Sequence, residues 1–426
     1  MWRIAMISEH ASPTATPGST DCGGQNIYVD QVSRELARLG HRVDVYTRAD
    51  GPNLATRHWR DGVRIIPVPA GPRVPIPKDD IWPHIDEFLA ETDRLGQMNG
   101  PYDIIHGNFW MSGWVSSHLK TRWNVPFVQI FHALGAIKRL QQGDADTSSP
   151  ERFAVERSVL AAADRIIAQC PSEVEDLADH YDADVGKIQV VPSGVDLSLF
   201  YPIPRDQARA ELGLAPDENI LVYVGRLQPR KDVANLVRAV AALRQVGLSG
   251  RLFERVRLVV VGGETPNGDL AREPEMRRLI RIAEELGIRE RVTFVGRRPA
   301  DRLRWYYSAA DVFTSTPWYE PYGLTPLEAM ACGTPAVGSA VGGIGFTIAD
   351  GETGFLVPPR SPEILARRLA LILSEEDLGH RFARNARRRV EEQFTWEAVA
   401  AKTARIYAEV LGTHVHSTSE TRSGNQ

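Results

Sequence analysis

This sequence has few cysteines and no long apolar run. Its three cysteines, Cys22, Cys170 and Cys332, are odd in number and far apart. They predict no disulfide framework, and they favour a reducing, cytoplasmic location. No stretch approaches the roughly 20 consecutive apolar residues of a membrane-spanning helix, so only peripheral membrane contact stays open. Residues 2–7 predict a strand, and they do not resemble a signal peptide.

An excess of charge is also missing. Lys and Arg number 50 and Asp and Glu number 54, which leaves a net charge of -4 at pH 7. This balance argues against a nucleic-acid partner, because a dedicated nucleic-acid binder is usually basic. A hydrophobic share of 43% is typical of a globular protein. At 426 residues the chain exceeds the usual size of a single hydrophobic core, so we expect two domains.

Short apolar runs alternate with helical patterns, and this series occurs twice. The expected strands are residues 4–7, 43–46, 104–105, 127–131, 166–167 and 188–191 in the first half, and 220–224, 256–261, 292–295, 312–313, 335–337 and 354–357 in the second. Near-continuous apolar strands alternating with helices predict parallel sheets with helices on both faces. The fold class is therefore α/β, with two Rossmann-like, doubly wound domains.

A polar, proline-bearing stretch around residues 192–204 separates the two series. We therefore expect a first domain over residues 1–200 and a second over residues 201–395. An amphipathic helix follows at residues 396–411, and the polar residues 412–426 predict a disordered tail. Doubly wound domains that face each other would place their ligand loops on a shared interdomain cleft.

Two glycine-containing loops that follow predicted strands have the composition of phosphate sites. Gly23 and Gly24 lie between the first strand and its helix, where the backbone can approach a phosphate. An ordinary loop turn is an equal alternative for this pair. Arg226 and Lys231 follow the strand at 220–224, and both side chains can reach one diphosphate. Only six of the 50 basic residues are lysine, so a lysine in such a loop favours a function over a solvated turn.

A pair of glutamates surrounds the predicted start of a helix. Glu320 precedes the helix among aromatic residues and prolines, and Glu328 lies within it, with Thr325 as the expected N-cap. Free backbone N–H groups at a helix start favour an anion. Carboxylates on both sides of it predict an anionic ligand with hydroxyls at both ends, such as a nucleotide sugar; two surface carboxylates are the alternative.

The sequence predicts no metal site and no cofactor. The pair Asp144 and Asp146 has the spacing of a divalent-cation motif, but its Gln/Gly/Ser/Thr-rich setting favours an acidic surface turn. His132 follows a predicted strand and would face the ligand cleft, although a lone histidine can equally be structural. Arg226 and Lys231 can neutralise a departing diphosphate as a metal ion does elsewhere.

The combined motifs resemble the retaining glycosyltransferases of family 4, which have the two-domain glycosyltransferase-B fold. They are the Gly23–Gly24 pair, Gly225-Arg226-Leu227 with Lys231, the segment from Glu320 to Glu328, and Cys332-Gly333-Thr334-Pro335. The resemblance runs from the first strand to about Leu411. It implies metal-independent transfer of a hexosyl group from a nucleotide sugar, and a helix at 396–411 that packs back on the first domain.

The resemblance also implies roles for individual residues. It makes His132, Arg226, Lys231 and Glu320 catalytic, with Glu320 on sugar hydroxyls and Glu328 on the ribose. The implied donor-binding residues are Gly23, Gly24, Arg226, Lys231, Arg298, Glu320, Tyr322, Gly323, Leu324 and Glu328, with Arg297 near the base. The implied acceptor-binding residues are Asn26, Lys78, Phe109, Ala133 and Arg152.

Within the family, the first half is similar to the inositol-phosphate glycosyltransferases of mycothiol biosynthesis. Those enzymes hold the acceptor phosphate with a lysine, a tyrosine, a threonine and an arginine. Here Lys78 and Arg152 keep the two cations, whereas Phe109 and Ala133 replace the two hydroxyls. Phosphate recognition is therefore expected and inositol phosphate is in question. The Gly-Gly-Gln sequence resembles the sucrose-phosphate and sucrose synthases instead.

The leading hypothesis is transfer from UDP-glucose or UDP-N-acetylglucosamine to a small phosphorylated sugar or polyol, by a cytoplasmic monomer or homodimer. Two alternatives stay open. One is a mannosyl- or glucosyltransferase of polysaccharide or glycolipid synthesis, and the other is a nucleotide-sugar epimerase of the same fold. A non-catalytic sensor would be expected to lack Arg226, Lys231 or Glu320, and all three are present.

Overall fold

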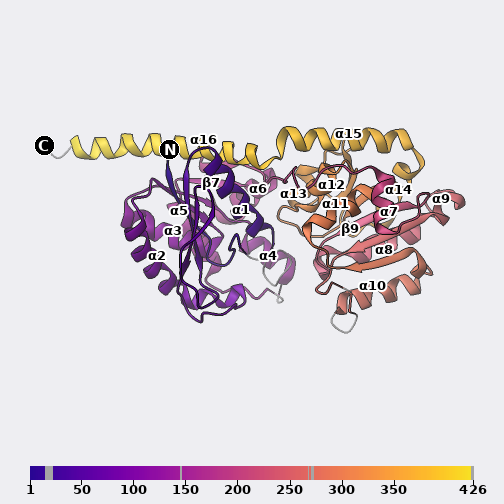
Figure 1. Cartoon of the computed structure of the whole chain (residues 1–426), viewed down its shortest axis with the longest axis horizontal. Helices are drawn as coiled ribbons and strands as arrows, with labels where there is room; N and C mark the ends of the chain where they lie inside the picture. Colours follow the sequence, from indigo (N-terminus) through magenta and orange to yellow (C-terminus); the bar gives the residue numbers. More distant parts are fainter. Residues whose placement is uncertain (15–22, 144–145, 267, 270–272, 424–426) are drawn as a thin grey trace. The chain divides into compact units, whose positions relative to one another are not determined.

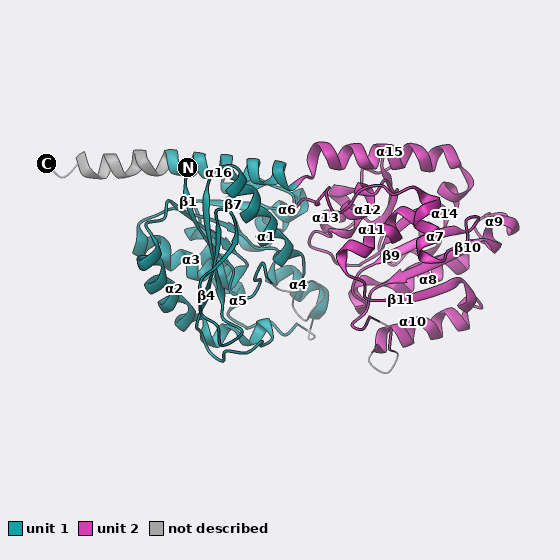
Figure 2. Ribbon diagram, in the orientation of Figure 1, with its two compact units in different colours: residues 1–192, 396–426 teal, residues 193–395 magenta. Residues whose placement is uncertain are grey.

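The computed structural model describes residues 1–14, 23–143, 146–266, 268–269 and 273–423, with no description of side chains beyond residue 412. The chain forms two compact units, Met1–Pro192 with Trp396–Gln426, and Ser193–Thr395 (Figure 2). Cys22 and Asp144 lie outside the described residues. Among the described residues, no helix is long and apolar enough to cross a membrane.

Unit 1 is built on an eight-stranded sheet in the order β3-β4-β2-β1-β5-β6-β7-β8, parallel except for β3. Its strands are β1 (Arg3–Ile7), β2 (Arg42–Arg48), β3 (Arg57–Arg60), β4 (Val63–Val68), β5 (Ile104–Asn108), β6 (Phe127–Ile130), β7 (Arg165–Ala168) and β8 (Ile188–Val190). The expected strands of this half are present. The sequence reasoning missed β3 and β4, because Pro67 interrupts the apolar run of β4 and proline usually marks an edge.

Helices cover both faces of this sheet (Figure 1). Successive residues of β1 point to opposite faces: Ala5 and Ile7 join one buried cluster, and Ile4 and Met6 join the other. The first cluster includes α2 (Ile85–Asn99), α3 (Trp110–Trp123), α5 (Arg152–Ala162) and α6 (Pro171–Tyr181). The second includes α1 (Gly24–Arg38) and α16 (Trp396–Ser423). Helix α16 packs against α1, and it continues past residue 411, where the sequence predicted its end.

Unit 2 has a six-stranded, fully parallel sheet in the order β11-β10-β9-β12-β13-β14. Its strands are β9 (Asn219–Val224), β10 (Val256–Val261), β11 (Val292–Gly296), β12 (Val312–Ser315), β13 (Ala336–Ser339) and β14 (Gly354–Val357). Its α-helices are α7 (Arg205–Leu212), α8 (Val233–Ala242), α9 (Gly250–Glu254), α10 (Pro274–Glu285), α11 (Ala300–Ala309), α12 (Thr325–Ala331), α13 (Gly342–Thr347), α14 (Pro362–Ser374) and α15 (Glu376–Gln393). The predicted α/β class with two doubly wound sheets is confirmed.

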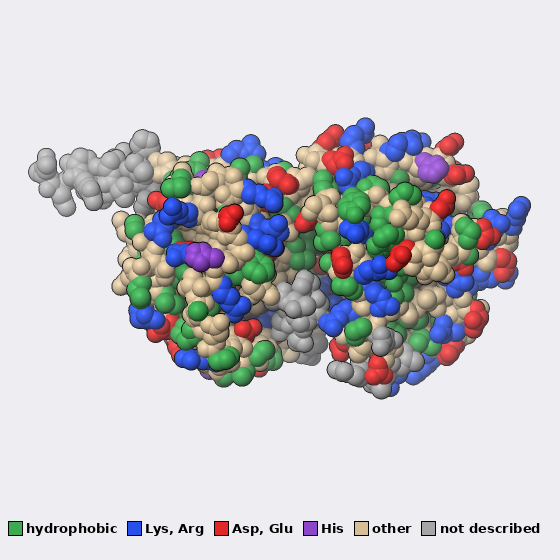
Figure 3. Space-filling model, viewed as in Figure 1, with side chains coloured by type: hydrophobic (Ala, Val, Ile, Leu, Met, Phe, Trp, Pro, Cys, Tyr) green, Lys and Arg blue, Asp and Glu red, His purple; other side chains and the backbone are tan. Residues whose placement is uncertain are grey.

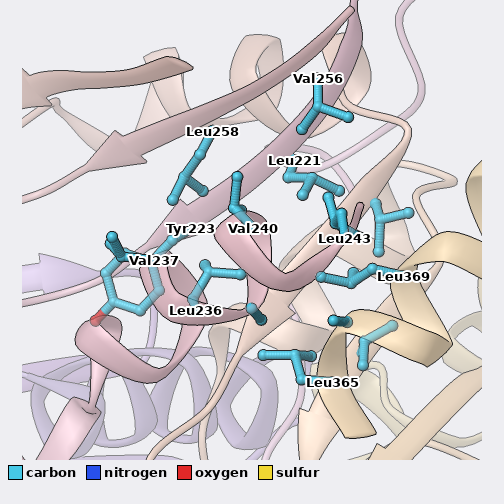
Figure 4. Close-up of a cluster of buried hydrophobic side chains, with 14 of the residues drawn as sticks. Leu221, Tyr223, Leu236, Val237, Val240, Leu243, Val256, Leu258, Leu365 and Leu369 are labelled. Atoms are coloured by element: carbon cyan, nitrogen blue, oxygen red, sulfur yellow. The ribbon is translucent and has the colours of Figure 1, made fainter. Parts of the chain in front are cut away.

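The core of unit 2 shows why the pattern forms this sheet. Leu221 and Tyr223 of β9 lie under α8 and α14, next to Leu258 of β10 (Figure 4). The intervening residues of β9, including Val222, belong to the opposite buried cluster with α12 and α15. Burial on both faces explains the continuous apolar strands. On the surface, Figure 3 shows acidic and basic side chains interspersed, as the small net charge predicts.

Candidate active site

In unit 2 the candidate site is built from loops at the carboxyl ends of β9 and β12, which are neighbours in the sheet. The loop after β9 contains Arg226, and it ends in a short 3-10 helix, η5 (Pro229–Lys231). The loop after β12 contains Glu320. Because parallel strands bring these loops to the same sheet edge, residues about 90 positions apart in the chain meet there.

Glu320 is the centre of a charged cluster. Its carboxylate pairs with the Lys231 ammonium group, and it lies 3.5 Å from an Arg230 guanidinium nitrogen. Arg230 also donates a hydrogen bond of 3.1 Å to the backbone carbonyl of Tyr319. The backbone amide of Trp318 donates to the Arg230 carbonyl at 3.1 Å, so Arg230 holds the Glu320 loop through both its backbone and its side chain.

Glu320 is buried and Lys231 is partly buried, and their pKa values reflect this environment. Burial opposes ionisation of Glu320, but the charges of Lys231, Arg230 and Arg226 outweigh it and hold the pKa of Glu320 below its usual value. Burial lowers the pKa of Lys231, against the attraction of Glu320. We infer an ionised pair, since each partner favours the charged form of the other.

Glycines give the Glu320 loop its tight turn. Gly323 has a φ of +85°, a conformation that L side chains rarely adopt. At Gly342, a Cβ atom would lie only 2.0 Å from the carbonyl oxygen of Glu320. Replacing Gly342 would therefore displace the backbone that carries the carboxylate.

Glu328 lies in the first turn of α12, as the sequence predicts. The N-cap position is Leu324, and Thr325 is already helical, so the expected cap at Thr325 is wrong by one residue. The Tyr307 hydroxyl donates a hydrogen bond of 2.6 Å to Glu328. Burial raises the pKa of Glu328 to about 7, and the hydrogen bond from Tyr307 opposes that rise.

Two other predicted donor residues have structural contacts of their own. The buried Tyr322 hydroxyl donates to the backbone carbonyl of Ser193 at 2.7 Å, so this hydroxyl has a structural partner. Arg298 donates to the carbonyls of Pro266 and Arg297, at 2.5 and 3.0 Å. It thereby joins the loop after β11 to the loop after β10.

In unit 1 the first glycine loop begins α1, with Gly23 as the N-cap and Gly24 as the first helical residue. A Cβ atom at Gly23 would meet no atom of the described residues within 4 Å. The Asn26 carboxamide bonds within the loop: it accepts from the Gly23 amide at 2.9 Å and donates to the Ser12 carbonyl at 3.0 Å. Asn26 therefore shapes the glycine loop.

His132 follows β6 in the left-handed conformation, with a φ of +61°. Its Nε2 lies 3.1 Å from Asn108 Oδ1, and the Tyr28 ring meets its imidazole edge-on at 4.9 Å. Burial lowers the pKa of His132 well below its usual value, and His106 and His10 add to this effect. The side chain is therefore neutral at physiological pH.

The structure brings three of the predicted acceptor residues together. Arg152 is buried and donates a hydrogen bond of 2.6 Å to the Ala133 carbonyl, while its guanidinium lies 5.0 Å from the centre of the Phe109 ring. Its Nε also bonds to Glu156 at 2.8 Å. Glu156 accepts further hydrogen bonds from the Gly135 amide and the Tyr181 hydroxyl.

The fourth side chain expected at the acceptor phosphate, Lys78, lies apart from Phe109, Ala133 and Arg152 in sequence. It lies on the short helix η1 (Lys78–Asp80).

The sequence reasoning missed several residues that contact the candidate site residues within each unit. Arg230 had a signal, as a third cation in the β9 loop, but Asn108, Glu156 and Tyr307 come from distant elements. Among the described residues, no cluster of three or more His, Cys, Asp or Glu side chains could hold a metal ion.

Comparisons with known proteins match both halves of the chain to glycosyltransferase families. Residues 22–199 match the Glycosyltransferase Family 4 model, and residues 204–389 match the model of glycosyl transferases group 1. A D-inositol 3-phosphate glycosyltransferase from Nocardia farcinica is 38% identical over 96% of this chain and 90% of its own length. Another, from Acidothermus cellulolyticus, is 40% identical over 87% and 82%.

Solved structures are similar over nearly the whole chain. A sucrose-phosphate synthase from Thermosynechococcus elongatus superimposes with a TM-score of 0.85 and 36% identity, covering 97% of this chain and all of that one. The Anabaena protein HepE, solved with UDP, has a TM-score of 0.72 at 18% identity over 96% of this chain and 100% of its own, which shows the shared fold alone. Fold and comparisons define a glycosyltransferase. The chain belongs to glycosyltransferase family 4, with the glycosyltransferase-B fold.

Proposed function

We propose that the protein transfers a hexosyl group, with retention of configuration and without a metal ion, from UDP-glucose or UDP-N-acetylglucosamine to a small phosphorylated sugar or polyol. The cluster around Glu320 is the observation that carries this proposal. It combines the cations Arg226, Arg230 and Lys231 with one carboxylate. An excess of positive charge beside a hydroxyl-binding carboxylate suits the diphosphate and sugar of a nucleotide-sugar donor.

The ribose end of the donor is assigned to Glu328. An ionised carboxylate has acceptor capacity for two ribose hydroxyls, and the Tyr307 hydrogen bond leaves the other Glu328 oxygen available to a ligand. The family resemblance supports uracil as the base, near Arg297 and Arg298.

The acceptor is assigned from unit 1 and from the relatives. Both kinds of relative, the inositol-3-phosphate glycosyltransferases and the sucrose-phosphate synthase, are named for a small phosphorylated molecule. In this chain Phe109 and Ala133 have no side-chain hydroxyl, and Arg152 is partly neutralised by Glu156. We therefore expect binding of the acceptor phosphate to depend more on Lys78 in this chain than in enzymes where two side-chain hydroxyls also bind the phosphate.

The chemistry we propose occurs on one face of the sugar. The bond between the anomeric carbon and the diphosphate oxygen breaks as the acceptor hydroxyl oxygen bonds to the same carbon from the same side. The acceptor proton passes to the departing phosphate oxygen, and Arg226 and Lys231 stabilise the charge that develops there. A trapped covalent glycosyl-enzyme would refute this front-face route.

One screen tests the proposal. UDP-, ADP- and GDP-sugars are each combined with fructose 6-phosphate, inositol phosphates and free sugars, and nucleotide release is measured with and without a chelator. We expect release to require a UDP-sugar and a phosphorylated acceptor, and NMR of the product should show the donor's anomeric configuration. Epimerised sugar from donor alone would favour the epimerase, and transfer only to a lipid or polysaccharide would favour the other alternative.

A further inference from the structure

Asn108 and His132 form a pair whose proton positions can be read from the geometry. Asn108 is the last residue of β5 and is fully buried. Its Nδ2 lies 3.3 Å from the Ile7 carbonyl and 3.4 Å from the His106 carbonyl. Carbonyl oxygens only accept hydrogen bonds, so the NH2 group must face them and Oδ1 must face His132.

This orientation determines which His132 nitrogen carries a proton. Asn108 Oδ1 can only accept, and it lies 3.1 Å from His132 Nε2. Nε2 must therefore be the donor. Since burial keeps the imidazole neutral, the ring has a single proton, and Nδ1 keeps its lone pair.

The surroundings of His132 support a neutral ring. The titratable side chains that face it are His10 after β1, His106 on β5 and Tyr28 on α1. The described residues bring no carboxylate within ion-pair distance of the imidazole, so none of them would form an ion pair with a charged ring. Nδ1 has no hydrogen-bond partner among these residues. It is also not one of the fully buried polar atoms among them, so it keeps some exposure to solvent. The lone pair is therefore accessible to a ligand.

We propose that Asn108 is a positioning residue that holds His132 as the Nε2–H tautomer, so that Nδ1 accepts a hydrogen bond from a hydroxyl of the transferred sugar. This inference rests on the proposed function and on the catalytic role that the family resemblance implies for His132. It adds a rule of specificity: the sugar atom that meets His132 must be a donor. Fluorine or a carboxylate at that position would face a lone pair and bind more weakly.

Nitrogen NMR of histidine-labelled protein tests the tautomer without any substrate. The chain has 11 histidines, and the His132→Gln variant assigns the resonance. We expect a protonated Nε2 and an unprotonated Nδ1 at neutral pH. A protonated Nδ1, or an imidazolium, in the wild-type protein would overturn the inference.

Variants of Asn108 test whether this residue controls the His132 tautomer or only stabilises the fold. Asn108→Ala removes the acceptor, and we expect His132 to become a mixture of tautomers. Asn108→Asp keeps the acceptor and adds a negative charge, so Nε2–H should persist and the pKa of His132 should rise. Gln129→Leu is the matched control, since the buried Gln129 carboxamide also donates to two backbone carbonyls, at 2.9 Å each, but makes no hydrogen bond to His132. An unchanged tautomer in Asn108→Ala would refute the role of Asn108.

Fluorinated donors test the hydrogen bond to the sugar. A series of UDP-glucoses, each with one hydroxyl replaced by fluorine, is compared by calorimetry for the wild type and His132→Ala. We expect one position at which fluorine weakens wild-type binding by about tenfold, the scale of one neutral hydrogen bond, and at which His132→Ala removes the penalty. If no position couples to His132, the inference fails.

The two proposals fail separately. If no nucleotide sugar binds or reacts, the proposed function is wrong, whatever the tautomer. If the enzyme is active but Nδ1 carries the proton, only this inference is wrong.

Discussion

The buried Glu328 carboxyl predicts that donor affinity depends on pH in the neutral range. Burial raises the pKa of Glu328 to about 7. If the ribose hydroxyls donate to this group, binding requires the carboxylate. The ionised fraction rises from about one tenth near pH 6 to about nine tenths near pH 8, so the Kd of UDP-glucose should be about tenfold weaker at the lower pH. Affinity therefore increases with pH and becomes constant above this range.

Isothermal titration calorimetry across this pH range measures both the affinity and the protons exchanged. UDP-glucose is the better ligand, because UDP has a terminal phosphate that itself titrates near about pH 6. At the lower pH, binding should release a proton as Glu328 ionises, and the observed enthalpy should depend on the buffer. In Glu328→Gln the pH dependence should disappear.

Tyr307→Phe tests the physical cause. The Tyr307 hydroxyl donates at 2.6 Å to Glu328 and favours its ionised form. A hydrogen bond to a charged group contributes about 1.5–3 kcal/mol, so its loss should move the pKa of Glu328 up by about one to two units. The rise in affinity should shift to higher pH by the same amount. Wild-type affinity that does not change with pH, or an equal slope in Glu328→Gln, would refute the reasoning.

Three further expectations concern the other parts of the site. Glu320→Ala should lower kcat by about a hundredfold or more while weakening UDP binding only a few fold, and a collapse of UDP affinity would show that Glu320 holds the other end of the donor. Arg152→Gln should lower the free energy of unfolding by about 3–5 kcal/mol, because it leaves Glu156 buried and unpaired; urea unfolding should show partial recovery on adding Glu156→Gln, and strictly additive losses would contradict the pairing. Lys78→Ala should raise KM for a phosphorylated acceptor about tenfold while slow donor hydrolysis persists, and unchanged acceptor kinetics would exclude Lys78 from the site.

Local patterns were sufficient to predict the fold class. Apolar runs such as residues 220–224 and 256–261 became β9 and β10, because strands buried on both faces must be apolar along their whole length. The same reasoning failed for β4, where Pro67 interrupts the pattern, and for β3, in which two of the four residues are arginine. Both segments form strands because of their positions in the sheet, and the sequence of a single segment does not reveal its position.

The sequence also predicted a donor motif from local chemistry. Arg226, Lys231, Glu320 and Glu328 have residue types and loop positions that indicate a phosphate and hydroxyl ligand. That Lys231 pairs with Glu320 across 89 positions is a property of the parallel sheet, which places the ends of β9 and β12 side by side.

By itself, therefore, the sequence determined the α/β class and the family resemblance and predicted a donor motif, since each depends on residue types at short spacings. Only the tertiary structure decided what surrounds the ionisable groups. It buries Glu328 against Tyr307, pairs Arg152 with Glu156, and aims the Asn108 carboxamide at His132. Protonation, charge and tautomer depend on burial and on partners that distant elements bring together, and the order of residues along the chain carries no sign of those partners.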